Sequence, residues 1–380
     1  MSRFVYLDNA ATTSTKKEVV DAMYPFFTES FGNPSSVYDF AAKNKKAVND
    51  SRQTIADALH ADVRDIYFTA GGSESDNWAL IATAEAYENK GKHIITSKIE
   101  HHAILHTCDY LESRGFEITY IDVDENGILK LDELKKAIRP DTILISVMFA
   151  NNEIGTIQPI REIGAICRKN GVLFHTDAVQ AAGHLQINVE KDQIDMLSLS
   201  AHKFNGPKGI GVLYAKTGVF LTNLIEGGGQ ERGKRAGTEN LPAIVGMVAA
   251  LEEACSLQKE RSIYVTKLRD QLIDGLKKIP GALLNGDATN RLPGNVNFCF
   301  PDTEAEGLLL LLDNKGICAS SGSACTSGFL DPSHVLLAIG RDPQTARGSL
   351  RLTLDYENTP EEVETIIEAV TDTVRILRGC

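Results

Sequence analysis

The sequence predicts an α/β fold with a mainly parallel sheet, and the alternation of its segments supports this prediction. Between residues 65 and 215, short runs of β-branched and aromatic residues alternate with amphipathic stretches of helical length. Buried strands that alternate with helices are typical of a parallel sheet with helices on both faces. The expected strands span residues 65–69, 93–96, 116–123, 142–149, 172–178, 195–200 and 209–215.

A second, smaller α+β domain is expected after about residue 257, where this alternation ends. Its expected segments are a helix over 258–279, strands over 296–300 and 349–354, and a final helix. Thr359 fits the N-cap of the final helix, with Pro360 at the first helical position and Glu362 closing a capping box. We predict a large domain over residues 15–257 and a small domain formed by residues 1–14 and 258–380.

Composition narrows the class of function. The formal net charge of -12 argues against nucleic acid as a partner, because a polyanion binder needs a basic surface. The seven cysteines form no CxxC pair, which indicates a reducing compartment and no zinc site. The first residues lack the apolar stretch of a signal peptide, and the longest apolar runs are too short to span a bilayer. We expect a cytoplasmic protein whose partners are small molecules or proteins.

The segment after the first strand, "AGGSESDN" at residues 70–77, is a candidate anion site. Small residues before a helix leave free N–H groups at its positive end, where a phosphate can bind. We expect Ser73 to cap this helix, with Asp76 at the capping-box position. The alternative is an ordinary strand-to-helix turn, because the segment matches no established phosphate-binding motif.

Polar side chains also follow the other strands, at the edge where parallel sheets bind ligands. The candidates are His101, Asn152, Asp177, Gln180, Ser200, His202 and Lys203. His102 and His106 are four residues apart and could share a helical face as metal ligands, but no further ligand is evident. We interpret these two as surface histidines and predict no metal site.

Lys203 is the most informative of these candidates. A lysine that projects from a buried strand end and is partly desolvated can attack a carbonyl to form a Schiff base. Together with an anion site at Gly72 and Ser73 and an aspartate at Asp177, this chemistry describes pyridoxal 5'-phosphate.

Cys325 differs from the other cysteines because its neighbours in "SSGSACTSG" are all small. Such flanks favour a solvated backbone, and an accessible thiol can react. We expect Cys108, Cys167, Cys255, Cys299 and Cys318 to be buried or half-buried. Cys380 is the last residue.

Ten motifs in order make the chain resemble the group I cysteine desulfurases of the NifS/IscS type, which are class V, fold-type I pyridoxal-phosphate enzymes. The resemblance covers essentially the whole chain. The motifs are "YLDNAATT", "FGNPSS", "SESDN", "EHHAIL", "NNEIG", "HTDAVQ", "SAHKFNGPKG", "RAGTEN", "SSGSACTSG" and "SLRLTL".

The resemblance implies a role for each candidate residue. Lys203 would form the Schiff base, and Gly72, Ser73, Ser200 and His202 would bind the phosphate. His101 would stack on the pyridine ring and assist proton transfer, Asp177 would hold the ring nitrogen, and Gln180 the phenolic oxygen. Asn152 and Arg351 would bind the substrate carboxylate. Thr238 would reach the phosphate of the neighbouring subunit in a homodimer.

The implied reaction converts L-cysteine to L-alanine and leaves a persulfide on Cys325. The sulfur would pass to an acceptor protein, such as an iron–sulfur scaffold or a tRNA-thiolation enzyme. Cys318 stands where the family more often has an aliphatic residue, and we favour a packing role for it. Two alternatives stay open: a selenocysteine lyase or another class V enzyme, and a thiol-bearing metallochaperone that is not an enzyme.

Overall fold

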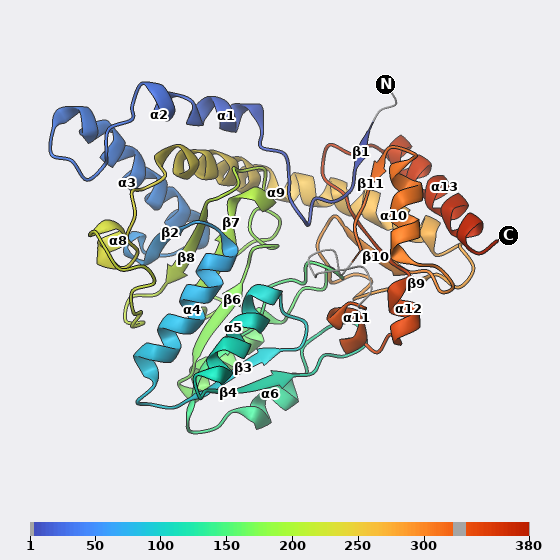
Figure 1. Ribbon diagram of the computed structural model, residues 1–380, viewed down its shortest axis with the longest axis horizontal. Coiled ribbons are helices and arrows are strands. Elements are labelled where there is room, and N and C mark those ends of the chain that lie inside the picture. Colours follow the sequence, from blue (N-terminus) through green and yellow to red (C-terminus); the bar gives the residue numbers. More distant parts are fainter. Residues whose placement is uncertain (1–3, 322–331, 380) are drawn as a thin grey trace.

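A seven-stranded sheet forms the centre of the computed structural model, which describes residues 4–321 and 332–379 (Figure 1). Its strands, in spatial order, are β2 (Ile66–Thr69), β8 (Gly211–Ala215), β7 (Met196–Ser200), β6 (Leu173–Asp177), β5 (Thr142–Ser146), β3 (His93–Ser97) and β4 (Glu117–Ile121). The strands from β7 to β4 are parallel, and β8 pairs antiparallel with both of its neighbours. The predicted mainly parallel sheet is confirmed.

Helices cover both faces of this sheet. One face packs against α3 (Asp39–Leu59), α7 (Ile160–Asn170) and α9 (Leu241–Leu276), and the other packs against α4 (Gly72–Tyr87) and α5 (His102–Ser113). Alternate strand residues serve the two faces: Leu197 belongs to the core of the first face and Met196 to that of the second.

A smaller sheet and its helices form another hydrophobic core. Its strands are β12 (Ser349–Thr353), β10 (Asn295–Cys299) and β9 (Leu283–Leu284), all antiparallel, and β1 (Val5–Tyr6) pairs nearby with β11 (Ile317–Cys318). The helices α10 (Ala305–Asp313) and α13 (Pro360–Leu377) pack against this core. The remaining helices are α1 (Lys17–Met23), α2 (Pro25–Thr28), α6 (Leu131–Ala137), α8 (Gln230–Gly233), α11 (His334–Ala338) and α12 (Pro343–Arg347).

The start of α13 has the predicted capping box. The Thr359 hydroxyl accepts the Glu362 N–H at 3.2 Å, and the Glu362 carboxylate accepts the Thr359 N–H at 3.2 Å. Pro360 takes the first helical position, where its missing N–H needs no partner.

The long helix α9 joins the two cores (Figure 1). It begins at Leu241, well before the helix expected over 258–279, because the Asn240 side chain caps its first turn. By length and composition it could cross a membrane, but half of its most apolar stretch is buried in the protein, as in a core helix. The predicted domain boundary after residue 257 lies inside α9, and the division into domains stays a prediction.

The cysteines largely follow the expected burial. Cys108, Cys167 and Cys299 are buried and Cys318 is half-buried, as predicted. The prediction for Cys255 is wrong: it is exposed on α9, because the neighbouring Ala254 takes the core-facing position.

Candidate active site

Lys203 lies directly beyond the carboxyl end of β7, in the short turn Ala201–Lys203. Its ammonium group donates hydrogen bonds to the carbonyl oxygens of Ala10 at 2.6 Å and Ala11 at 2.7 Å. The N-terminal segment therefore passes over the lysine, and Gln180 donates to the same Ala10 carbonyl at 3.0 Å. This arrangement holds the lysine amine at the edge of the sheet where the sequence predicted a ligand.

Asp177 ends the neighbouring strand β6 and is buried. Burial raises the pKa of its carboxyl to about 6, while the N–H of Val179 and the charge of Lys203 oppose this increase. The carboxyl is therefore mostly ionised at pH 7, and it can pair with a cationic ring nitrogen.

His101 is the N-cap of α5, after the end of β3. Its Nδ1 accepts the N–H of Ala103 at 3.1 Å, which leaves Nε2 as the protonated nitrogen of the neutral ring. Burial lowers the pKa of His101 to about 4, and the nearby charge of Lys203 lowers it further. The ring is neutral at pH 7, which suits stacking on an aromatic cofactor.

A cavity at the start of α4 contains the predicted anion site. It is lined by Thr12, Ala70, Gly71, Gly72, Ser73, Glu74, Ser200, His202, Lys208 and Gly209. An added Cβ at Gly72 would lie 2.6 Å from Cγ2 of Val179, so only glycine fits there without a shift. His202 contacts the Thr12 hydroxyl at 3.1 Å through Nδ1, and burial lowers its pKa to about 4.

The predicted cap of α4 is wrong. The helix begins at Gly72 with Gly71 as its N-cap, so Ser73 lies inside the first turn and Asp76 is buried behind it. Gly71 has a φ of 153°, a conformation that favours glycine and lets the chain turn directly from strand to helix. Gly72 and Ser73 of this first turn still line the cavity, and the start of a helix is a favourable place for an anion.

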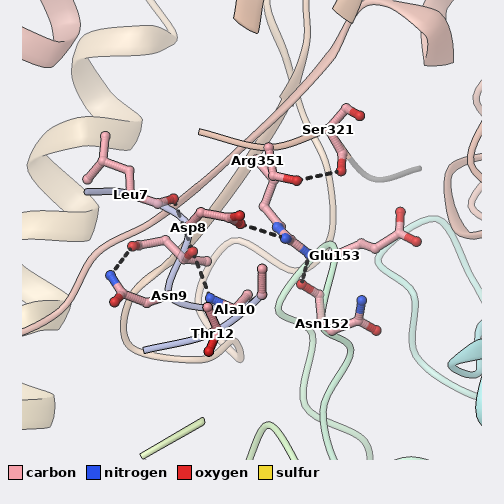
Figure 2. Close-up of polar contacts among 12 residues, drawn as sticks. Leu7, Asp8, Asn9, Ala10, Thr12, Asn152, Glu153, Ser321 and Arg351 are labelled. Atoms are coloured by element: carbon pink, nitrogen blue, oxygen red, sulfur yellow. Dashed lines mark hydrogen bonds and ion pairs between the residues drawn. The ribbon is translucent and has the colours of Figure 1, made fainter. Parts of the chain in front are cut away.

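Arg351 lies on β12, and its guanidinium points toward Asp8 and Asn152 (Figure 2). It donates to the Asp8 carboxylate at 2.8 Å and to the main-chain carbonyl of Asn152 at 3.1 Å. The neighbouring Asn151 has a structural role, because its side chain binds the carbonyl of Ile99 and the N–H of Glu153. Arg351 and Asn152 are thus adjacent, as their shared predicted role requires.

The other two predicted site residues are Thr238 and Cys325. Thr238 is exposed in the loop before α9. Cys325 lies outside the described residues.

Sequence reasoning missed several residues of the site: Asp8, Ala10, Ala11, Thr12 and Lys208. The motifs "YLDNAATT" and "SAHKFNGPKG" contain all five, but neither gives the contact that each residue makes.

Two further buried carboxyl groups border the site. Burial raises the pKa of Glu100 to about 8, opposed by hydrogen bonds from Ser97 and from the N–H of Met148. Burial also raises the pKa of Glu153 to about 7, opposed by a hydrogen bond from Ser333 and by the charge of Arg351.

Comparisons with known proteins agree with this geometry. The family model for class-V aminotransferases matches residues 5–366. A protein of Methanosarcina thermophila named cysteine desulfurase IscS is 57% identical over 378 residues, covering 100% of this chain and 94% of that protein.

Solved structures give the same result. A NifS-like protein matches with a TM-score of 0.93 and 38% identity, covering 98% of this chain and 100% of that one. SspA in complex with cysteine matches with a TM-score of 0.82 and 38% identity, covering 93% and 100% of the two chains.

The chain belongs to the class-V aminotransferase family, whose members use pyridoxal phosphate. Within that family it is of the IscS/NifS type, a pyridoxal-phosphate-dependent cysteine desulfurase with the fold of type I enzymes. The predictions of fold class, family, enzyme activity and cofactor are confirmed. The alternative of a metallochaperone is wrong.

Proposed function

We propose that this enzyme takes sulfur from L-cysteine at the Lys203 site, releases L-alanine and carries the sulfur as a persulfide on Cys325. The observation that carries this proposal is the convergence of Lys203, Asp177 and His101 beside the Gly72 cavity, at one edge of the sheet. The similar SspA was solved in complex with cysteine, which supports the choice of substrate.

The residues of this edge fit the chemical groups of pyridoxal phosphate. Gly72, Ser73, Ser200 and His202 would hold the phosphate, since the cavity offers hydroxyls, an imidazole and the N–H groups of a helix start. Lys208 lines the same cavity and adds a positive charge that the sequence analysis did not assign.

The ring of the cofactor would meet three other side chains. Asp177 would hold the ring nitrogen, Gln180 the phenolic oxygen, and His101 would stack on the ring. When bound, the cofactor withdraws electrons from the substrate's Cα. Lys203 would hold the cofactor and then move the Cα proton, a role open to an amine placed beside the end of β7.

Arg351 and Asn152 would bind the substrate's carboxylate. The guanidinium is buried and close to Asn152, so a carboxylate there would form hydrogen bonds assisted by charge. This contact would fix the substrate's Cα relative to the lysine.

Cys325 would supply the nucleophile for sulfur. Its thiolate would form a bond to the substrate's sulfur as the carbon–sulfur bond breaks, and the carbon would take a proton to give L-alanine. The sum is L-cysteine plus the enzyme thiol giving L-alanine plus the enzyme persulfide. This assignment rests on the sequence motif, since Cys325 lies outside the described residues.

The active unit would be a homodimer in the cytoplasm, and Thr238 would complete the partner's phosphate site. Exposed aromatic residues gather on α2, α3 and the loop between them, which is an apolar surface that a second copy could cover: Tyr24, Phe27, Phe31, Tyr38 and Phe40. The persulfide sulfur would pass to a protein acceptor, either an iron–sulfur scaffold or a tRNA-thiolation enzyme.

Three variants test this function. The parent should be yellow with cofactor and should form alanine from L-cysteine, whereas Lys203→Ala should bind the cofactor without the absorption band that depends on Lys203 and should lose the turnover. Cys325→Ser should keep the colour but form no alanine, because a hydroxyl cannot replace a thiolate in attack on sulfur.

Cys318→Ser is the matched control and should keep most of the activity. Mass spectrometry after one turnover should find the added sulfur on the peptide that contains Cys325. Added sulfur only on Cys318 or Cys380, or alanine from Cys325→Ser at the parent rate, would contradict the assignment.

A further inference from the structure

The N-terminal segment from Asp8 to Ala11 contacts two cations of the site, Lys203 and Arg351. The carbonyls of Ala10 and Ala11 accept the ammonium of Lys203, and the carboxylate of Asp8 accepts the guanidinium of Arg351 (Figure 2). The proposed cofactor-binding residue and the proposed substrate-binding residue are therefore tied to the same short stretch of chain.

This stretch is fixed on β12 through Thr353, two residues beyond Arg351. The N–H of Thr353 binds the carbonyl of Leu7 at 2.7 Å, and the Thr353 hydroxyl accepts the N–H of Ala10 at 3.0 Å. The Asn9 amide adds a hydrogen bond to the Thr353 carbonyl at 2.7 Å. These bonds place the Asp8 carboxylate beside the arginine with little freedom to move.

The Arg351 guanidinium keeps part of its hydrogen-bonding capacity. It has five N–H groups, of which Nη2 donates to Asp8 at 2.8 Å and Nη1 donates to the Asn152 carbonyl at 3.1 Å. Its Nε is buried and has no hydrogen-bond partner among the described residues. A carboxylate ligand can thus bind the guanidinium while Asp8 stays in place.

Two opposite effects of Asp8 are conceivable. Its negative charge repels a second carboxylate, whereas its fixed position holds the guanidinium in one orientation. The arginine side chain is only 6% exposed. Removal of Asp8 would leave the buried Arg351 charge without its partner, and the guanidinium would then turn toward other acceptors. Asp8 lies in a segment that is hydrogen-bonded to β12, and the other contact of the guanidinium is the main-chain carbonyl of Asn152, so we expect orientation to outweigh repulsion.

We propose that Asp8 is a positioning residue for substrate binding: it holds Arg351 so that the guanidinium recognises the α-carboxylate of an amino acid. This inference rests on the proposed function of Arg351. In addition, the inference assigns the selectivity for a carboxylate to the Asp8–Arg351 pair and to the N-terminal segment that contains Asp8.

The test compares ligands with and without a carboxylate, using holoenzyme of the parent and of Asp8→Ala. The KM for L-cysteine should rise at least about tenfold with kcat within about threefold, because the ion pair orients binding and does not touch the reacting atoms. The dissociation constant of L-alanine, read from the cofactor's absorption, should rise by a similar factor. Cysteamine, which lacks the carboxylate, should bind both proteins equally.

Matched variants separate positioning from a general structural effect. Asp8→Asn keeps an oxygen acceptor and should fall between the parent and Asp8→Ala. Asn9→Ala weakens the attachment to Thr353 but keeps the Asp8 carboxylate, so the L-alanine constant should rise less than in Asp8→Ala while the cysteamine constant stays near that of the parent. In an Arg351→Ala background, Asp8→Ala should add less than about twofold, because the two residues act as one pair.

Specific outcomes would overturn the inference. A KM that falls or stays constant in Asp8→Ala would show that Asp8 repels the substrate or has no role in binding. An equal loss of cysteamine and L-alanine binding would show general damage to the site. A parent protein that neither binds the cofactor nor forms alanine would instead refute the proposed function, before Asp8 is tested.

Discussion

Replacement of Glu153 by glutamine should change how the stability of the protein depends on pH. Glu153 lies in the turn after β5, is 4% exposed, and accepts a hydrogen bond from the Ser333 hydroxyl at 2.5 Å. Burial raises the pKa of its carboxyl from 4.5 to about 7 in the folded protein. The folded state therefore holds this proton more tightly than the unfolded state does.

The sign and size of the effect follow from linkage. The stabilisation from the bound proton is fully present below pH 4.5, and it is lost as the pH rises through 7. An increase of about 2.5 in the pKa corresponds to about 3 kcal/mol of unfolding free energy. Glu153→Gln cannot ionise and keeps an oxygen that can accept from Ser333. Relative to the parent, its stability should rise by up to about 3 kcal/mol between pH 4.5 and pH 8.

The assay is urea unfolding of the cofactor-free proteins at several pH values, with the difference between variant and parent as the readout. Glu361→Gln is a control of opposite sign, since hydrogen bonds from its own N–H and from Thr359 hold the pKa of that carboxyl below its usual value. Its stability relative to the parent should fall as the pH rises. Parallel curves for Glu153→Gln and the parent would refute the reasoning about the buried carboxyl.

Two further predictions concern the phosphate site and assembly. In Gly72→Ala the added methyl would lie 2.6 Å from Val179 Cγ2, so the affinity for the cofactor should fall about tenfold, the result of an overpacking cost of about 1–3 kcal/mol. Gly229→Ala is the control, because a Cβ added there meets nothing within 4 Å. Equal affinities of Gly72→Ala and the parent in a titration with pyridoxal phosphate would contradict the prediction. Sedimentation should give a particle of twice the chain mass of 41.4 kDa. Phe31→Glu should shift it toward a monomer, because dimer formation would bury a charge at the aromatic surface that is exposed in the single chain. A fully active monomer of the parent would exclude the proposed dimer.

The sequence predicted those site residues that follow from local pattern. His101, Asp177, Ser200 and Lys203 each stand at or just after the end of a parallel strand, and such ends meet at one edge of the sheet. Pattern alone therefore places these residues together, without knowledge of any side-chain contact. The capping box at Thr359 was predictable for the same reason, since it depends on four consecutive residues.

Contacts over long sequence separation were not predictable. Ala10 is 193 residues from Lys203, and Asp8 is 343 residues from Arg351, so neither pairing leaves a periodic or local signal. A prediction from local sequence was also wrong at the start of α4, where the conformation of a neighbouring residue decides where the helix begins. A serine beside two glycines favours a cap, yet the freedom of Gly71 lets α4 start one residue before Ser73.

The charge state of the site is another property that residue types alone could not give. Asp76, Glu100, Glu153 and Asp177 are all buried acids near strand or helix ends, and burial raises the pKa of each. Burial raises the pKa of Asp177 to about 6, and the N–H of Val179 and the charge of Lys203 oppose this increase.

Glu100, with a pKa of about 8, is mostly protonated at neutral pH. Burial and the charge of Asp177 raise the pKa of Asp76 well above its usual value. Asp177, with a pKa of about 6, is mostly ionised at neutral pH, so a cationic ring nitrogen brought to this edge of the sheet would meet a carboxylate there. The N–H of Val179 and the charge of Lys203 both oppose the effect of burial on Asp177. The lysine that would hold the cofactor thus also helps to keep ionised the carboxylate that would stabilise the cofactor's ring.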